Sequence, residues 1–294
     1  MSTRAINMLR AAELERVRAL VEARGLGLLF LKGMAFVDTL YPDPGERPMC
    51  DADLLVRPDE RAAVARLLVE QGYRRPGGAV ARERPVTCAT DYELGLRSPP
   101  PLAMSVELHS GFCQPQRYQV DLAGVWRRAV RLRAAGREIP TLAAEDQLLY
   151  LALHLSKHGF MADGRVDEDI RRAIAQWRPD WRVVVERARQ WRIRTGLYVA
   201  LLRARSAGAE VPATVLDELR PGLARRLLMD RIVDRRDGYR SRQQRWSRGW
   251  QAVTVLLSVE HPANLARFVA SYGALRARDW YAARRQRSAV EGRR

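Results

Sequence analysis

The chain has 294 residues, of which 47% are hydrophobic and 29% charged, and it carries a formal net charge of +17 at pH 7. This composition is typical of a globular protein with a substantial core, as one large or two smaller domains. No apolar run approaches the ~20 residues that a membrane helix needs, and the N-terminus lacks the apolar core of a signal peptide, so we expect a cytoplasmic protein. The charge indicates anionic partners: nucleoside triphosphate, nucleic acid, acidic peptide or membrane surface.

The first part of the chain alternates between helical and strand-like patterns. An amphipathic helix is predicted over Ala5–Arg24, and a buried strand follows over Leu26–Leu31. A short helix over Ala35–Tyr41 and a turn-rich loop then lead to a second strand that opens with Asp51 and Asp53. Side chains two apart on a strand share a face, so these carboxylates lie close together, where a divalent metal is the usual partner. Solvated loop carboxylates are the alternative.

A third helix is predicted to begin near Pro58 and to end at Gly72. The hairpin predicted after it supplies a further carboxylate. The run Val86–Leu96 is strand-like, a proline-rich turn follows, and Leu102–His109 reads as a returning antiparallel strand. Glu107 and His109 share one face of that strand. If the hairpin lies beside the Asp51 strand, Glu107 becomes the third metal ligand; otherwise it is a solvated glutamate. His109 either lines the same pocket or only forms a hydrogen bond there.

Cysteine spacing gives no sign of a metal or disulfide framework. Cys50, Cys88 and Cys113 are widely separated, and disulfides are not expected in the cytoplasm. Cys50 next to Asp51 is either a reactive thiol or a buried bystander, and the second interpretation is favoured.

Beyond Tyr118 the pattern predicts helices for the rest of the chain, over 121–133, 144–158, 168–177, 181–192, 196–207 and 212–230. The change defines a catalytic domain over 1–117 and a helical domain over 118–230. A basic helical extension over 231–294 carries interleaved aromatic residues, namely Trp246, Trp250, Trp280 and Tyr281.

The helix over 144–158 carries His154, Lys157 and His158 on one side. A histidine pair four residues apart can bind zinc, but no third ligand is evident. The three side chains form either a cationic patch that faces a nucleotide or an ordinary core and surface. Asp169 in the next helix is a candidate partner of the patch.

Of the 51 basic residues only Lys32 and Lys157 are lysines, and both lie in stretches selected on other grounds. An ammonium is a compact point charge, whereas guanidinium is a planar fork, so a site that retains lysine is expected to need it. Chance is the alternative.

Several short motifs, in this order and spacing, resemble the uncharacterised bacterial nucleotidyltransferase family of the DNA polymerase beta-like superfamily. They are Leu31-Lys32-Gly33, Leu40-Tyr41, Arg47-Pro48-Met49, Asp51-Ala52-Asp53-Leu54-Leu55-Val56, Val106-Glu107-Leu108-His109 and the stretch from Glu145 to Gly159. The resemblance covers roughly Gly25 to Leu219. It implies an α+β fold in which a small mixed-sheet, palm-like nucleotidyltransferase domain precedes a helical domain.

The resemblance also implies a reaction and roles for individual residues. The enzyme would move NMP from an NTP, ATP by default, to a hydroxyl or phosphate of a small molecule, ribosomal peptide, protein or RNA. Two Mg²⁺ ions would be bound by the catalytic carboxylates Asp51, Asp53 and Glu107. The nucleotide would be bound by Lys32, Gly33, Met34, Arg47, His154 and Lys157. Met34 stands where the superfamily usually has Gly or Ser, so only its backbone is expected to contact phosphate.

Two other functions remain open at this stage. A nucleic-acid-binding protein would use the basic aromatic C-terminal part to grip phosphates and stack bases. A degenerate transferase would bind nucleotide without reacting, although retention of all three carboxylates argues against it.

Overall fold

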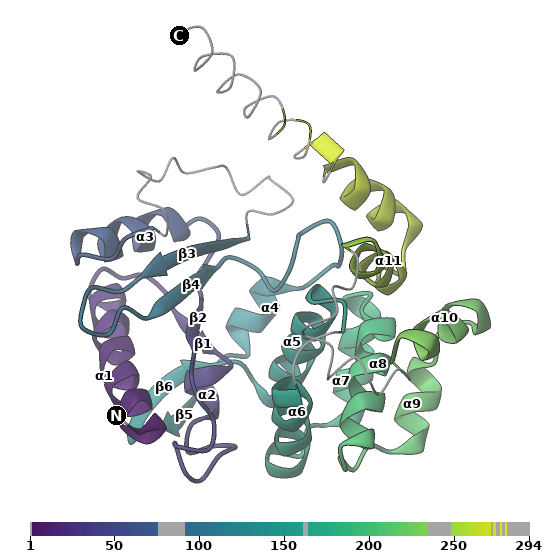
Figure 1. The fold of residues 1–294 in the computed structure, drawn as a ribbon, viewed down its shortest axis with the longest axis horizontal. Coiled ribbons are helices and arrows are strands. Elements are labelled where there is room, and N and C mark those ends of the chain that lie inside the picture. The colour runs from purple at the N-terminus through teal and green to yellow at the C-terminus, as the bar shows by residue number, and fades with distance from the viewer. Residues whose placement is uncertain are drawn as a thin grey trace, which may run out of the picture.

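The computed structural model describes residues 2–75, 92–160, 164–233 and 248–271, together with 273, 274, 277 and 280. A sheet with two flanking helices forms one half of the molecule, and a group of helices forms the other (Figure 1). This arrangement confirms the predicted α+β class.

The sheet has six strands in the order β3-β4-β2-β1-β6-β5. They are β1 Leu29–Leu31, β2 Asp51–Leu55, β3 Glu93–Arg97, β4 Ser105–His109, β5 Val130–Ala134 and β6 Arg137–Thr141. Strand β2 is antiparallel to β1 and parallel to β4, while β1 is parallel to β6. Hairpins join β3 to β4 and β5 to β6, so the sheet is mixed, as predicted.

Burial follows the alternation of side chains along the central strands. In β4, Val106 and Leu108 are fully buried on one face, and Glu107 and His109 point to the other. All three residues of β1 are buried, as expected for a short central strand. The polar face of β4 and β2 is therefore directed toward the second half of the molecule.

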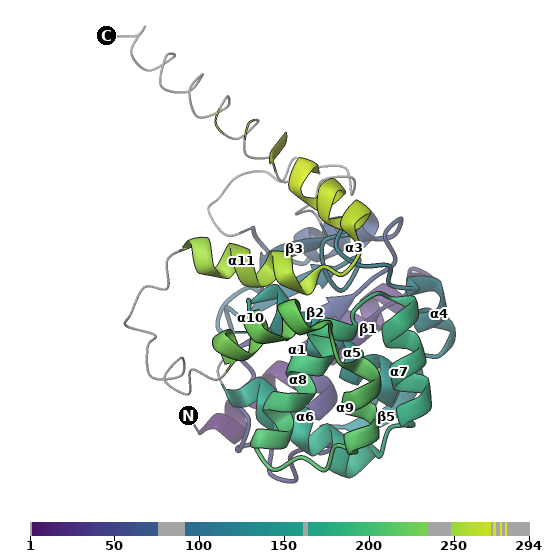
Figure 2. The ribbon, with the colours of Figure 1, turned by 90° about the vertical axis from the view of Figure 1, so that its right-hand side faces the viewer.

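Helix α1 (Thr3–Glu22) and helix α3 (Arg61–Glu70) cover the side of the sheet away from the helical half (Figure 1). The remaining helices are α2 Gly33–Phe36, α4 Leu122–Arg127, α5 Ala144–Lys157, α6 Gly164–Trp177, α7 Trp181–Gln190, α8 Arg194–Ser206, α9 Ala213–Leu219, α10 Leu223–Val233 and α11 Arg248–Ser258. Residues 262–271 are also helical. Figure 2 shows α11 lying above α8 and α10.

Helix α5 is the centre of the helical half, because α6, α7, α8 and α11 all pack against it. Ten of its 14 residues are buried, in accord with its long apolar run. Its last turn, which carries His154 and Lys157, is directed at the sheet. The predicted helix over 144–158 is thereby confirmed as α5, Ala144–Lys157.

The helix predicted over 121–133 is wrong beyond Arg127. Helix α4 ends there, and the chain returns to the sheet as the β5–β6 hairpin. A boundary at 117/118 would separate β1 from its parallel neighbour β6. We therefore propose that the first domain extends through Thr141 and that the helical domain begins with α5.

Three other predictions need adjustment or fall outside the described part. The helix over 212–230 is two helices, α9 and α10, which are separated at Pro221-Gly222, residues that disfavour a continuous helix. The helix over Ala35–Tyr41 is shorter and earlier, as α2. Several predicted features lie outside the described residues: the start of the strand over Val86–Leu96, Cys88, Trp246, Tyr281 and the side chain of Trp250. In the described helices, none has the length and apolarity needed to span a membrane.

Candidate active site

Three carboxylates lie on adjacent parallel strands, as the sequence predicted for a mixed sheet. Asp51 and Asp53 come from β2 and Glu107 from β4, where Asp53 and Glu107 are direct register partners. His109 bridges the two strands: its Nε2 lies 2.9 Å from Asp53 Oδ1 and 3.4 Å from Glu107 Oε2. Ligand atoms of Asp53, Glu107 and His109 all lie within 4.8 Å of one another. Among the described residues, this group has the composition and spacing of a metal site.

The two aspartates have opposite electrostatic environments. Burial tends to raise the pKa of Asp53, but Lys32 and His109 outweigh burial and hold that pKa well below its usual range. The Lys32 ammonium lies 3.0 Å from Asp53 Oδ2. The pKa of Asp51 is raised instead, first by burial and then by repulsion from Asp53. The charged form of Asp51 is thus disfavoured by burial and by its neighbour, and a bound cation would stabilise it.

Lys32 occupies a strained position at the end of β1. Its φ is 36° and its ψ −134°, a conformation that costs a non-glycine residue on the order of 1–3 kcal/mol. This kink turns the chain into α2 and directs the ammonium to Asp53. Gly33 follows with ordinary φ, but a Cβ there would come 3.3 Å from the Met49 side chain. Its lack of a side chain therefore serves close packing, and Met34, only 1% exposed, is a core residue.

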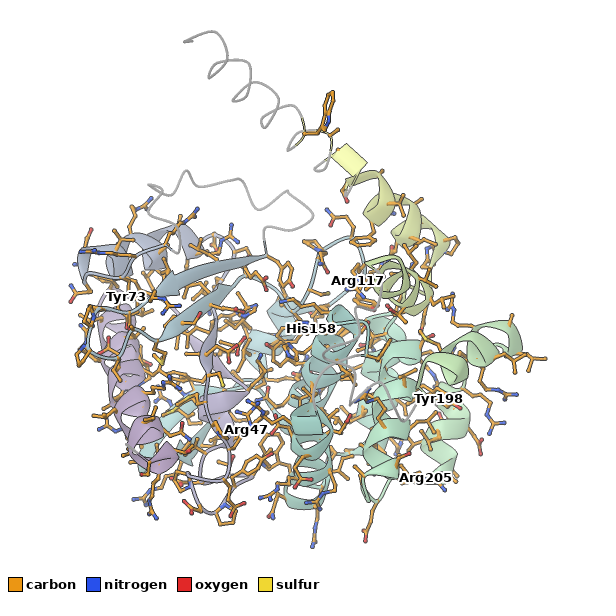
Figure 3. All side chains as sticks on the ribbon, in the orientation of Figure 1. Arg47, Tyr73, Arg117, His158, Tyr198 and Arg205 are labelled. Atoms are coloured by element: carbon orange, nitrogen blue, oxygen red, sulfur yellow. The ribbon has the colours of Figure 1, made fainter. Side chains whose placement is uncertain are left out.

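The last turn of α5 brings basic groups to the same side of the sheet. Lys157 Nζ lies 2.5 Å from Glu93 Oε2 and 5.3 Å from the Tyr92 ring centroid. The pKa of His154 is well below its usual value, because of burial first and the positive charge of Lys32 second. The His154 and His158 rings are in contact, with centroids 4.8 Å apart. Helical and sheet residues thus face each other here, and Figure 3 shows His158 at this junction.

Buried polar atoms without a partner accompany these groups. They are the hydroxyls of Tyr92 and Tyr150 and Nδ1 of His109. Because buried polar groups are normally satisfied, unpaired atoms beside a carboxylate cluster are what a site for water, ion or ligand presents. Sequence reasoning did not identify Tyr92, Tyr150 or Glu93, because only the strand register and the docking of α5 reveal their position.

Arg47 lies within electrostatic range of Asp51, but its hydrogen bonds are made to a carboxylate outside the row. Its guanidinium forms two hydrogen bonds to Asp169 in α6, at 2.8 and 2.7 Å, and Tyr41 donates a third to the same carboxylate at 2.7 Å. Arg47 is only 9% exposed and Asp169 is fully buried. The pair connects the loop before β2 to the helical half (Figure 3). Asp169 is thus paired with Arg47 and not with the basic turn of α5.

Cys50, which was expected to be buried, is exposed immediately before Asp51. Its sulfur accepts a long hydrogen bond of 3.6 Å from Arg165. Cys113 is buried, and both thiols are free.

Comparison with a protein-family model identifies the class as nucleotidyltransferase. The model of the family described as uncharacterised nucleotidyltransferase matches residues 2–207, well over half of the chain, so the protein belongs to that family. Among solved structures, the antibiotic-resistance factor ANT(2'')-Ia is similar over 70% of this chain and 100% of its own, with 16% identity and a TM-score of 0.44. No curated protein matches the sequence. The predicted family and enzyme class are confirmed.

Proposed function

We propose that this nucleotidyltransferase uses Mg²⁺ to transfer NMP from an NTP, ATP by default, to a hydroxyl or phosphate of its acceptor. The observation that carries the proposal is the row Asp51, Asp53 and Glu107 beneath the basic last turn of α5. The sheet thus provides acidic ligands for cations, and the helix provides a cation for phosphates, which are the two kinds of group that a metal-bound triphosphate requires. The acceptor could be a small molecule, a peptide, a protein or an RNA end.

The residues present fit a divalent cation. Carboxylate oxygens are the ligands that Mg²⁺ prefers, and the pKa of Asp51, raised by burial and then by repulsion from Asp53, would be lowered by a bound cation. Asp51 and Asp53 would hold two ions and Glu107 one of them. When bound, such ions orient the triphosphate, lower the pKa of an acceptor hydroxyl and stabilise the departing pyrophosphate. His109 would keep Asp53 and Glu107 in place through its two contacts.

The basic groups would neutralise the triphosphate by exchanging partners. Lys157 is paired with Glu93 and Lys32 with Asp53, so each ammonium already lies beside the site with an anion that phosphate can replace. His154, held neutral by its low pKa, would act as a hydrogen-bond donor or acceptor. For Gly33 and Met34, only the backbone is available to phosphate. Arg47 would act indirectly, by fixing the loop that leads to Asp51.

Pyrophosphate release without nucleic acid tests the proposal against nucleic-acid binding. The purified protein is incubated with each NTP and Mg²⁺, with pools of hydroxyl-bearing small molecules, peptides or RNA added separately. We expect Mg²⁺-dependent pyrophosphate release and an acceptor mass increased by one NMP. The nucleic-acid-binding alternative predicts salt-dependent RNA binding and no pyrophosphate with any acceptor. The pseudoenzyme alternative predicts nucleotide binding alone.

A further inference from the structure

Arg117 is a buried cation that the proposed chemistry does not use. It is 1% exposed, which makes it the most deeply buried basic residue in the described part of the chain. Two other buried cations have carboxylate partners: Lys32 has Asp53 at 3.0 Å, and Arg47 has Asp169 at 2.7 Å. For Arg117, no carboxylate of the described residues lies within the 4.0 Å of an ion pair. Burying a charge without a counter-ion is costly, so its retention calls for a reason.

Neutral groups surround the guanidinium instead. One terminal nitrogen, with two hydrogens to donate, lies within hydrogen-bond distance of three hydroxyls: Tyr118 at 3.2 Å, Ser156 at 3.1 Å and Ser258 at 3.0 Å. The Tyr118 hydroxyl lies 2.8 Å from both serine oxygens, which closes the network. The other terminal nitrogen donates to Gln114 at 3.2 Å, and Nε has no partner. We call Arg117, Tyr118, Ser156 and Ser258 the hydroxyl hub.

The hydroxyl hub joins three segments that are far apart in the chain. Arg117 and Tyr118 follow β4, Ser156 lies in the last turn of α5, and Ser258 ends α11. Asn264 adds a hydrogen bond of 3.3 Å to the Arg117 carbonyl. In Figure 3, Arg117 lies where the segment after β4 meets α11. The segment 248–271 is thereby attached to the core, although it lies outside the family-matched range of 2–207.

Ser156 immediately precedes Lys157, the residue with which α5 ends. The chain then turns sharply through Gly159 and Phe160, both of which have positive φ. The hydroxyl hub therefore contacts α5, through Ser156, in the same turn from which Lys157 and His158 face the carboxylates.

We propose that Arg117 is a positioning residue: through the hydroxyl hub, to which the C-terminal segment contributes Ser258, it fixes the last turn of α5 and thereby the position of Lys157. The contact of Lys157 with triphosphate rests on the proposed function above, whereas its placement by the hub does not. The test accordingly has one measurement with nucleotide and one without.

Two mild variants break the hydroxyl hub, and a third provides a matched control. Ser258→Ala removes the α11 hydroxyl, and Tyr118→Phe removes the bridging hydroxyl while keeping the ring. Glu260→Ala loosens the same C-terminal segment elsewhere, because Glu260 accepts a hydrogen bond from the Thr195 backbone at the start of α8. Near-ultraviolet circular dichroism verifies that each full-length variant is folded.

The nucleotide-free measurement uses the fact that the chain has only two lysines. Acetic anhydride labels Lys157, and the buried Lys32 serves as internal reference in the mass spectrum. We expect Lys157 to react about threefold faster or more in both hub variants, the scale set by one lost hydrogen bond, and at the wild-type rate in Glu260→Ala. Mg·ATP affinity should fall about three- to tenfold in the hub variants alone.

Each outcome decides one proposal. Faster Lys157 labelling confined to the hub variants supports the hub, even if wild-type protein binds no Mg·ATP, a result that would count against the proposed function only. Unchanged labelling in both folded hub variants overturns the hub, and so does an equal increase in Glu260→Ala. If Ser258→Ala does not fold, Tyr118→Phe gives the decision.

Discussion

His109 and His154 lie on opposite sides of the candidate site, and their pKa values are shifted in opposite directions. Burial opposes the charged form of His109, but its contacts with Asp53 and Glu107 outweigh burial and raise its pKa. For His154, burial and the neighbouring Lys32 both favour the neutral form and depress the pKa. Two buried histidines should therefore respond to pH in opposite directions, which makes each a control for the other.

The opposite pKa shifts should be visible in how the free energy of unfolding depends on pH in metal-free buffer. A histidine whose pKa is higher in the folded protein stabilises the fold fully when the pH is below its unfolded-state pKa of about 6.5. This stabilisation is lost as the pH rises through its folded-state pKa. The stability deficit of His109→Gln should thus shrink between pH 6 and 8.5. A histidine whose pKa is lower in the folded protein destabilises the fold when the pH falls below its unfolded-state pKa of about 6.5, because the unfolded state then binds the proton more readily. The free energy of unfolding of His154→Gln should therefore rise relative to that of wild type as the pH falls from 7 to 5.5.

Urea unfolding of wild type and both variants at several pH values measures these differences. If the free energies of unfolding of the two variants changed with pH in the same way, the opposite pKa shifts of the two histidines would be contradicted.

Lys157 offers a second test at this scale, because arginine would keep its charge and change its shape. A guanidinium can bind Glu93 through two parallel hydrogen bonds, which strengthens the contact that a triphosphate has to replace. We expect Lys157→Arg to weaken NTP binding by about tenfold, or about 1.4 kcal/mol, with thermal stability retained. Isothermal titration calorimetry measures the affinity. Wild-type affinity and turnover in the variant would show that lysine is not required.

At the scale of elements, local patterns predicted the strands and the helix that form the candidate site. The alternation along β2 and β4 placed Asp51, Asp53 and Glu107 correctly, and the long apolar run identified α5. The β5–β6 hairpin was missed because the helix predicted from Asp121 was extended through β5, although apolar residues and arginines alternate along β5 as they do in a strand. Its turn, Ala135-Gly136, has positive φ at both positions, and the glycine was a second local signal of it.

Contacts between distant elements could not be predicted from the sequence. Which carboxylate lies beside Lys157 depends on the β3–β4 register and on how α5 docks, and neither leaves a local pattern. The pairing of Arg47 with Asp169, 122 residues apart, is another such contact. Long-range charge pairs of this kind are determined by packing, which a single sequence does not reveal.

The Arg47–Asp169 pair is expected to stabilise the junction between the two halves. Arg47→Met leaves Asp169 buried without its cation, with only the Tyr41 hydroxyl remaining. We expect a loss of about 3–5 kcal/mol in the free energy of unfolding, and a large part of it should return in Arg47→Met combined with Asp169→Leu. The exposed pair Arg189–Glu218 is the control, since breaking it should cost less than about 1 kcal/mol. Equal effects at the two pairs would contradict the structural role of Arg47.

At the scale of the whole molecule, the two halves make complementary contributions. The sheet supplies Asp51, Asp53 and Glu107, while the last turn of α5 supplies Lys157 and the histidines. The protein carries a net charge of +17, yet its candidate site contains a local row of acids. Such an arrangement suits an anionic substrate that arrives with cations, because the substrate is attracted to the molecule as a whole and its metal to the acids.

The most direct test of this arrangement is the effect of Mg²⁺ on nucleotide affinity in wild type and Asp51→Asn. Asp51 is the better choice of the two aspartates, because Asp53 also compensates Lys32 and His109, and its loss would disturb the fold. Removing the charge of Asp51 relieves repulsion from Asp53, so the variant should be folded and at least as stable as wild type.

A non-hydrolysable ATP analogue is titrated calorimetrically into each protein, once with Mg²⁺ and once with EDTA. We expect Mg²⁺ to strengthen binding to wild type by about tenfold or more, about 1.4 kcal/mol, and to have little effect on Asp51→Asn. Equal Mg²⁺ dependence in the two folded proteins would contradict the assignment of the carboxylate row as the metal site.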